Sequence, residues 1–342
     1  MANVLVTHAD LPLGRRIVKV LWHDPEVERV VALGEGPVPR AFGTYRIGAA
    51  PRLVYERVDL ARQRAVADFF KSKRLRSLEV DSIVHVPRHG AAPEGPPVVA
   101  KVPTRTAEAR LVLHHAIEAR GVRNLVALSS AFVYKLAPGN ANHLTERSEL
   151  DLDPEVAAEI RAWIDCDMLF QAQVSGRTDA ASRRLRVVLL RLPTVVASGG
   201  YVYWNPALAG AAGPRVRPAG FDPLCPVIAD KDVARAVCAA LRARSSGVFN
   251  VAGRELLPLS MLGRWTGRPC VPVPGPLLRA AAAGAARLGR ETLSSAIHGP
   301  HLRYGMSLDT SRAARELGFE PRYRIGVTRA GDGAMRLEAV AV

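Results

Sequence analysis

A chain of 342 residues, 48% of them hydrophobic, has the length and composition of a globular protein with one large α/β domain or two unequal ones. No apolar run reaches the roughly 18–20 residues of a membrane span, and the N-terminus lacks the basic region and apolar stretch of a secretory signal peptide. We therefore expect a cytoplasmic protein with no membrane span.

The net charge of +15 at pH 7 raises nucleic acid or an anionic membrane surface as partners. However, lysine occurs at only six positions, and the excess of arginine, alanine, glycine and proline is typical of a GC-rich genome. The one dense basic cluster, "KSKRLR" at 71–76, has no interleaved aromatic residues for stacking on bases. Nucleic-acid binding is therefore disfavoured, and an anionic-surface binder is the least favoured function.

The four cysteines lie far apart and include no C-x-x-C pair; they are Cys166, Cys225, Cys238 and Cys270. This spacing disfavours a disulfide framework and a zinc site, and it favours reduced structural thiols. No metal site is predicted.

In chain order, short apolar runs alternate with helical patterns through the first 192 residues. Strands are predicted at 3–7, 29–33, 52–60, 82–86, 124–130 and 185–192. Helices are predicted at 13–22, 61–71, 103–120 and 154–175. Strands that are apolar nearly throughout, separated by helices, indicate a parallel sheet covered on both faces. Right-handed crossovers then give a Rossmann-like, doubly wound α/β fold.

The composition changes after residue 193, where Gly and Pro become frequent. We expect a dinucleotide-binding-type domain over 1–192 and a smaller C-terminal substrate lobe over 193–342. Within the lobe, a helix at 230–243 and a strand at 247–253 would return to the Rossmann sheet as part of 228–253. The rest is expected to be helical, most clearly at 277–289 and 310–319, with the first of these docked within the lobe rather than on a membrane. Four closely spaced residues are candidates for ligand contact: Tyr201, Tyr203, Trp204 and Asn205.

Several segments together resemble the extended short-chain dehydrogenase/reductase superfamily, in its NAD-dependent epimerase/dehydratase group. They follow the family's order along nearly the whole chain, and the order indicates the fold more strongly than any one segment. The segments are "VLVTHADLPLGRRIVKVL" (4–21), "VDL" (58–60), "DSIVHVP" (81–87), "NLVALSSAFVY" (124–134), "LLRLPTVVAS" (189–198), "IADKDVARAV" (228–237), "FNVAG" (249–253) and "DTSRAARELGFEPRY" (309–323).

The resemblance implies a G-x-x-G-x-x-G loop after the first strand, and His8, Leu11 and Gly14 occupy its three glycine positions. Those glycines make a tight turn, admit the pyrophosphate and let helix and strand pack closely, and only the packing glycine is retained. Leu11 places a branched side chain where phosphate oxygens lie, and Pro12 removes an N–H from the anion-binding helix end. Asp10 either repels a diphosphate or caps the helix, and we favour the cap.

The resemblance also implies the remaining cofactor positions. Gly34 stands where an acidic residue would hold the adenosine ribose, Glu35 is one step out of register, and Arg40 suits either a 2′-phosphate or an ordinary loop. The sequence thus leaves NAD and NADP both open and predicts weakened or absent dinucleotide binding. The implied cofactor positions are Asp10, Leu11, Leu13, Gly14, Gly34, Asp59, Leu60, Val86 and Pro193.

The superfamily's chemistry uses a Tyr and a Lys four residues apart on one helical face, where the ammonium lowers the phenol pKa. By resemblance, Trp163 stands at the Tyr position and Asp167 at the Lys position, and no Tyr or Lys occurs between 154 and 175. An indole N–H does not titrate usefully, and a carboxylate opposes formation of an anionic base. The usual catalytic dyad is absent.

Other residues keep an enzymatic alternative open. Ser130 matches the family's catalytic Ser/Thr position, and Tyr134 matches a tyrosine that lies off the catalytic face. Asp165, Asp167 and His143 form a candidate acid/base set, although carboxylates on a helix are more often a solvated face.

The joint loss of the phosphate loop and the dyad favours a non-catalytic member that binds an unknown small molecule or a protein partner. The alternative is an atypical epimerase, dehydratase or reductase with relocated acid/base residues, supported by Ser130, the run 191–193 and Asp232. The resemblance also implies a homodimer through the helices at 103–120 and 154–175.

Overall fold

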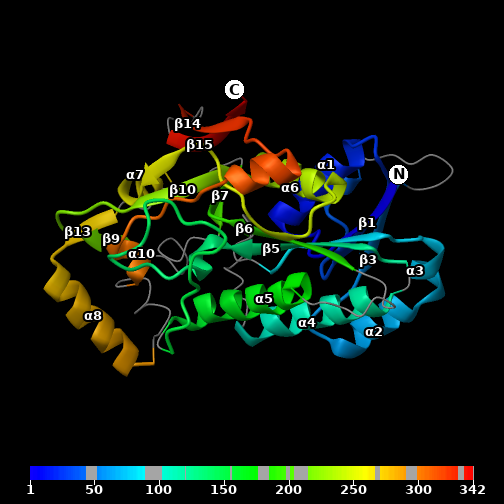
Figure 1. The fold of residues 1–342 in the computed structure, drawn as a ribbon, viewed down its shortest axis with the longest axis horizontal. Helices are drawn as coiled ribbons and strands as arrows, with labels where there is room; N and C mark the ends of the chain where they lie inside the picture. Colours follow the sequence, from blue (N-terminus) through cyan, green and yellow to red (C-terminus); the bar gives the residue numbers. More distant parts are fainter. Residues whose placement is uncertain are drawn as a thin grey trace.

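The computed structural model describes residues 1–43, 52–88, 102–119, 121–154, 156–175, 185–197, 201–203, 215–265, 270–289, 299–329 and 335–341. Seven parallel strands form the central sheet, so the predicted doubly wound parallel sheet is confirmed (Figure 1). In spatial order they are β11 (Gly247–Asn250), β6 (Arg186–Leu192), β5 (Asn124–Ser130), β4 (Ser82–His85), β1 (Ala2–Val6), β2 (Val27–Gly34) and β3 (Leu53–Arg57).

Helices cover both faces of this sheet (Figure 1). One face carries α1 (Pro12–His23) and α6 (Asp230–Arg242), which pack against each other. The other carries α2 (Gln63–Lys71), α4 (Val102–Glu118) and α5 (Ala158–Ser175), with the short α3 (Lys73–Ser77) after α2. Helix α5 begins at Ala158, four residues after the expected start at Pro154.

The period-two side-chain alternation of a strand explains why the sheet has a core on each face. In β1, Val4 and Val6 join the apolar cluster beneath α1 and α6, while Leu5 joins the cluster beneath α2, α4 and α5. Because both faces are buried, the strands read as continuous apolar runs in the sequence.

The C-terminal part contains more strands than expected. A second sheet has the order β12 (Leu256–Pro258), β10 (Leu224–Ala229), β7 (Thr194–Ala197) and β8 (Tyr201–Tyr203). Strand β9 (Arg215–Pro218) pairs with β13 (Cys270–Val273), and β14 (Tyr323–Arg329) with β15 (Met335–Ala341). The helices are α7 (Leu259–Trp265), α8 (Gly275–Arg287), α10 (Pro300–Arg303) and a π-helical turn, Ala313–Leu317.

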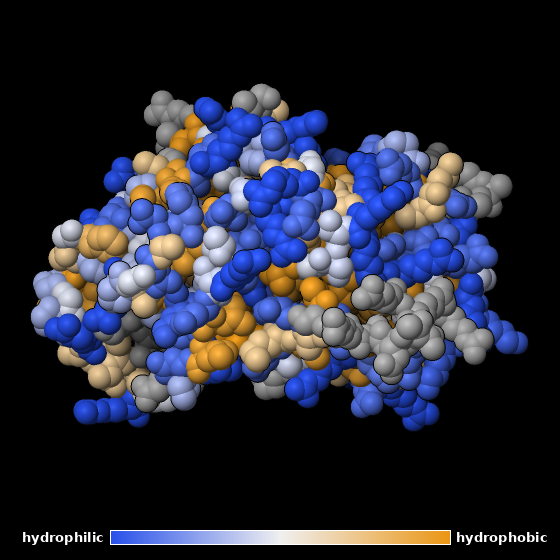
Figure 2. Space-filling view, in the orientation of Figure 1, coloured by the Kyte–Doolittle hydropathy of each residue, from blue (hydrophilic) through white to orange (hydrophobic). Residues whose placement is uncertain are grey.

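The two segments beyond 253 that were expected most clearly to be helical are present as α8 and the π-helical turn, but the expectation that the rest of this part is helical missed four described strands, β12, β13, β14 and β15. The alternating residues Tyr323, Ile325 and Val327 pack on the cluster around Leu259 and Leu262, which is the period-two pattern of a strand with one buried face. Hydrophilic residues dominate the described part of the face in Figure 2, with apolar residues exposed in small areas between them. None of the described helices is long and apolar enough to cross a bilayer.

Candidate functional site

The turn after β1 keeps the backbone of a glycine loop without its first two glycines. His8 is buried with a positive φ of 47°, and the N–H of Leu11 donates to the His8 carbonyl across 3.0 Å. Leu11, half-buried, is the N-cap residue of α1, and Pro12 is its first residue. A Cβ on Gly14 would overlap the His8 carbonyl oxygen, so this glycine lets the helix lie directly on the turn.

The interpretation of Asp10 as the helix cap is wrong, because α1 has no side-chain cap. Instead, the N–H groups of Glu35 and Gly36 each donate to Asp10 Oδ2 across 3.0 Å. Asp10 and the Tyr55 hydroxyl lie so close to Gly34 that a Cβ there would overlap both. Asp10 therefore joins the β1–α1 turn to the end of β2, the edge at which a Rossmann fold holds adenosine.

A chain of ion pairs crosses the carboxyl ends of β1, β4 and β2. His8 Nε2 lies 3.0 Å from Oε2 of Glu108 on α4, and the other Glu108 oxygen accepts from Arg88 Nη2 across 3.1 Å. Arg88, which follows β4, also pairs with Glu35 after β2. Burial raises the pKa of Glu108, but the contacts with His8 and Arg88 lower it by more than burial raises it. The net pKa of Glu108 therefore lies below the ordinary value.

The other implied cofactor positions surround this network without joining it. Leu13, Leu60 and Val86 are buried core residues, and Pro193 is buried between β6 and β7. Asp59 is half-buried, accepts from the N–H of Ala61 and pairs with Arg62, as a turn residue does.

The resemblance assigns Asp167 on α5 to the position of the family's lysine, and its carboxylate has no exposed surface. Arg191 on β6 makes a two-pronged contact with it, from Nε to Oδ2 at 2.9 Å and from Nη2 to Oδ1 at 2.7 Å. Ser129 Oγ and Gln171 Nε2 donate to the same two oxygens. Burial lowers the pKa of Arg191, but the hydrogen bonds and charge of Asp167 raise it above its ordinary value, so the guanidinium stays charged.

Asp167 is therefore neither on a solvated face nor part of a relocated acid/base set. Asp165 lies on the exposed side of α5, and His143 is exposed and lies 2.8 Å from Ser307 Oγ. The structure does not bring these three residues together.

Ser130 and Tyr134, on either side of the short helix η2 (Ala131–Val133), have structural partners. Ser130 Oγ accepts from the N–H of Phe132 across 3.2 Å. The Tyr134 hydroxyl donates to Asn250 Oδ1 across 2.6 Å, and the Arg191 guanidinium lies over the Tyr134 ring. Burial raises the pKa of Tyr134 to about 12 despite the Arg191 charge, which makes it a poor acid at neutral pH.

Trp163, which the resemblance assigns to the position of the family's tyrosine, is buried on α5 beneath Arg105 of α4. The Arg105 guanidinium carbon lies 4.2 Å from the centre of an indole ring. Sequence reasoning missed Arg88, Arg105 and Glu108. Arg88 directly follows the segment "DSIVHVP" that resembles the family, and the charges of α4 at a three-residue spacing were the only other signal.

Of the predicted ligand-contact residues, Trp204 and Asn205 lie outside the described residues, and Tyr201 and Tyr203 are described only as strand β8. A cavity of about 200 Å³ lies elsewhere in the C-terminal part, beside β9 and α8. It is lined by Pro218, Phe221, Gly275, Leu278, Arg279, Leu302 and Arg303.

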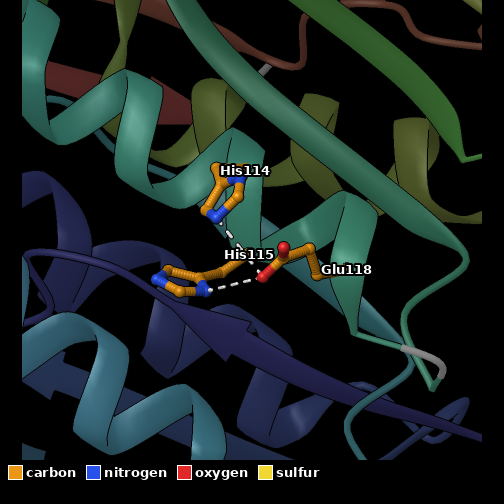
Figure 3. A group of neighbouring side chains, drawn as sticks. All are labelled: His114, His115 and Glu118. Atoms are coloured by element: carbon orange, nitrogen blue, oxygen red, sulfur yellow. Dashed lines mark ion pairs between the residues drawn. The ribbon is translucent and has the colours of Figure 1, made fainter.

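Among the described residues, one group has side chains of the kinds that bind metal ions: His114, His115 and Glu118 on α4 (Figure 3). Glu118 Oε2 lies 3.3 Å from His114 Nε2 and 3.8 Å from His115 Nδ1. His115 also stacks on Phe70 at 4.8 Å between ring centres. These ion pairs and the ring contact account for the arrangement, which is separate from the ion pairs at the strand ends.

No protein-family model matches the chain. A search of curated proteins finds an uncharacterized protein of Mycobacterium tuberculosis and one of Mycobacterium bovis, each 28% identical over 326 residues, or 94% of this chain and 80% of the relative.

Solved structures give fold matches along almost the whole chain. Two are dTDP-glucose 4,6-dehydratases: one from Bacillus anthracis with NAD (TM-score 0.62, 14% identity, 94% of this chain and 92% of that one), and one from Streptomyces venezuelae with NAD bound (0.63, 19%, 96% and 94%). A third is a UDP-glucose 4-epimerase from Thermotoga maritima (0.60, 16%, 94% and 94%).

Together with the seven-stranded sheet, these matches define the class. The chain has the fold of the NAD-dependent epimerase/dehydratase group of extended short-chain dehydrogenases/reductases, which confirms the predicted resemblance at the level of the fold.

Proposed function

We propose that this protein is a divergent, non-catalytic version of the epimerase/dehydratase fold that binds a small molecule or a protein partner. The observation that carries the proposal is the buried Asp167–Arg191 pair, because it replaces the cationic partner of a catalytic tyrosine with a neutralised carboxylate. Trp163 has no proton to exchange near neutral pH. The Tyr–Lys oxidoreductase step therefore has neither its acid/base group nor the ammonium that activates it.

Weakened NAD or NADP binding is the second part of the proposal. The neighbouring folds named above include NAD complexes, so the fold itself is compatible with a dinucleotide. In this chain, however, Glu108 is buried beside the turn that would receive the pyrophosphate, and Asp10 accepts the N–H groups at the end of β2. The Glu108 carboxylate opposes a diphosphate, and Asp10 occupies backbone donors at the adenosine edge.

A catalytic protein with relocated groups is less well supported, because the residues that favoured it have structural partners. Ser130 accepts a backbone N–H at the start of η2. Asp232 is fully buried and accepts the N–H groups of Arg322 and Tyr323, which fastens the start of β14 to α6. We also propose a cytoplasmic location, and an assembly through α4 and α5 that follows the resemblance.

Nicotinamide fluorescence tests the proposal directly. We expect titration of the full chain with NADH and with NADPH to give binding weaker than about 0.1 mM, near the low-affinity limit for specific cofactors. We also expect no reduction or oxidation of the nicotinamide with UDP-glucose, dTDP-glucose or a simple ketone. Submicromolar binding with turnover of any of these substrates would refute the non-catalytic assignment.

A further inference from the structure

Arg105 carries a buried positive charge whose donors are only partly used. It lies in the first turn of α4, and its side chain is about 6% exposed. Its Nη2 donates to the Arg88 carbonyl across 3.3 Å, but its Nε and Nη1 have no hydrogen-bond partner among the residues that the structure describes. Buried guanidinium donors are normally all paired, so an acceptor is missing here.

The nearby carboxylates do not supply that acceptor. Glu159 on α5 is partly exposed, and its Oε1 lies 4.0 Å from Arg105 Nη2. Glu108, one turn further along α4, already binds His8 and Arg88. Burial lowers the pKa of Arg105 despite the opposing charges of Glu159 and Glu108, as expected for a cation with too little compensation.

The surroundings define what such an acceptor would be. The guanidinium carbon of Arg105 lies over the Trp163 ring, and an acceptor for the unpaired donors has to lie where the N–H bonds point, in the guanidinium plane. An oxyanion satisfies the donors and neutralises the charge at the same time, which a water molecule does not. The N-terminal turn of a helix also favours negative charge.

We infer that Arg105 and Trp163 form a binding site for the oxyanion of a ligand, a carboxylate or a phosphate group, at the position where the fold's oxidoreductases have their tyrosine. The inference deepens the proposed ligand-binding function and rests on it. The Trp163 indole occupies the place of the proton donor and forms one side of the binding site. Arg105 is the residue that would recognise the ligand's charge.

Thermal unfolding of the full chain tests the inference with sodium phosphate and sodium acetate as probes, each compared with sodium chloride at equal ionic strength. We expect one probe to raise the Tm of the wild type in a saturable manner, and the responding probe identifies the group as phosphate or carboxylate. Arg105→Met should remove this response. It should not lower the Tm without a probe, because it deletes a buried charge that has only one distant carboxylate and one long hydrogen bond to offset its burial. Arg110→Met, at an exposed arginine of the same helix, should keep the response.

Calorimetric titration with the responding probe gives the affinity. Arg105→Gln should weaken it by about tenfold or more, as expected for loss of a charged hydrogen bond. No saturable response to either probe, or an equal response in Arg105→Met, would overturn the inference. A lower Tm for Arg105→Met without a probe would also overturn the inference, because it would show that Arg105 stabilises the fold in the absence of a ligand. Neither measurement involves a nicotinamide, so failure here is separable from failure of the proposed function.

Discussion

His8 shows how a single side chain can take over the conformation of a glycine. Its φ of 47° lies in the left-handed region, which costs a non-glycine residue about 1 kcal/mol. The buried contact with Glu108 offsets that strain and fixes the ring over the strand end. The turn of a dinucleotide loop is thus retained, while the space above it contains the protein's own ion pair.

The first prediction concerns this turn. Replacing His8 and Leu11 together by glycine should strengthen NADH binding by about tenfold, because the turn regains its freedom and loses a branched side chain. Adding Glu108→Gln should strengthen it further, since the carboxylate released by His8 would otherwise repel the diphosphate. NADH fluorescence titration measures both effects, with exposed His143→Gly as the control. Unchanged affinity in the triple variant would show that the loop is not the limiting defect.

The second prediction concerns Asp167. Asp167→Asn should destabilise the protein by about 3–5 kcal/mol, because it leaves the Arg191 charge buried without a counter-ion. Urea unfolding measures the loss, and exposed Asp165→Asn on the same helix should change stability by no more than about 0.5 kcal/mol. Equal stability of the two variants would mean that the Asp167–Arg191 pair does not hold α5 to the sheet.

For single residues, the sequence predicted that the family's glycines, tyrosine and lysine are replaced, but not which contacts the replacing side chains make. The helix spacing singled out Trp163 and Asp167 and places Gln171 one turn from Asp167, whereas the other two partners of Asp167 come from β5 and β6, 38 and 24 residues away. Asp10 next to Pro12 has the local pattern of a helix cap, yet it binds a backbone 25 residues further on. Local patterns do not contain such distant partners.

Among the elements, α1 lies on the β1 turn with no space between them. Gly14→Ala should therefore destabilise the protein by about 1–3 kcal/mol, since the added methyl overlaps the His8 carbonyl and backbone atoms cannot move aside. Gly284 in α8 is the matched control, because a Cβ there meets nothing within 4 Å. Gly284→Ala should stabilise by about 0.5–1 kcal/mol through helix propensity. Urea unfolding of both variants should give opposite signs, and two changes of the same sign would contradict the close packing of α1.

The elements of the Rossmann part were predictable because both faces of the sheet are buried, and each strand reads as a continuous apolar run. The strand at 124–130 has the predicted bounds, and the helix near 61–71 begins two residues late. The C-terminal strands β12 and β13 are only three and four residues long, too short for a clear alternation of apolar and polar residues. Strand β14 was missed because the end of the chain was expected to be helical.

For the whole molecule, two buried histidines predict acid sensitivity. Burial, with the His8 charge as a smaller cause, lowers the pKa of His85 to about 3, and burial lowers that of His301 to about 4. Both pKa values lie below the unfolded value near 6.5. Their stabilisation is therefore complete above pH 6.5 and is lost as pH falls towards the folded values.

We expect the free energy of unfolding to fall by about 1.4 kcal/mol per histidine for each pH unit below about 6.5. Urea unfolding at a series of pH values measures the slope. His301→Phe should reduce it by one histidine's share, because His301 Nε2 has no hydrogen-bond partner to lose within the described part of the chain. His114→Gln, at an exposed histidine, should leave the slope unchanged, and a wild-type slope of zero would contradict the prediction.

The return of β11 to the central sheet, after the chain has already passed through β7 and β10, has a consequence for how the polypeptide can be divided. A fragment ending at residue 192 would lack both β11, the neighbour of β6, and α6, which covers the apolar side of β1 and β6. Such a fragment would expose an unpaired strand edge and a hydrophobic surface, so it should aggregate on expression. Truncation at the change in composition near residue 193 should therefore not give a stable domain, and the two parts have to be expressed as a single chain.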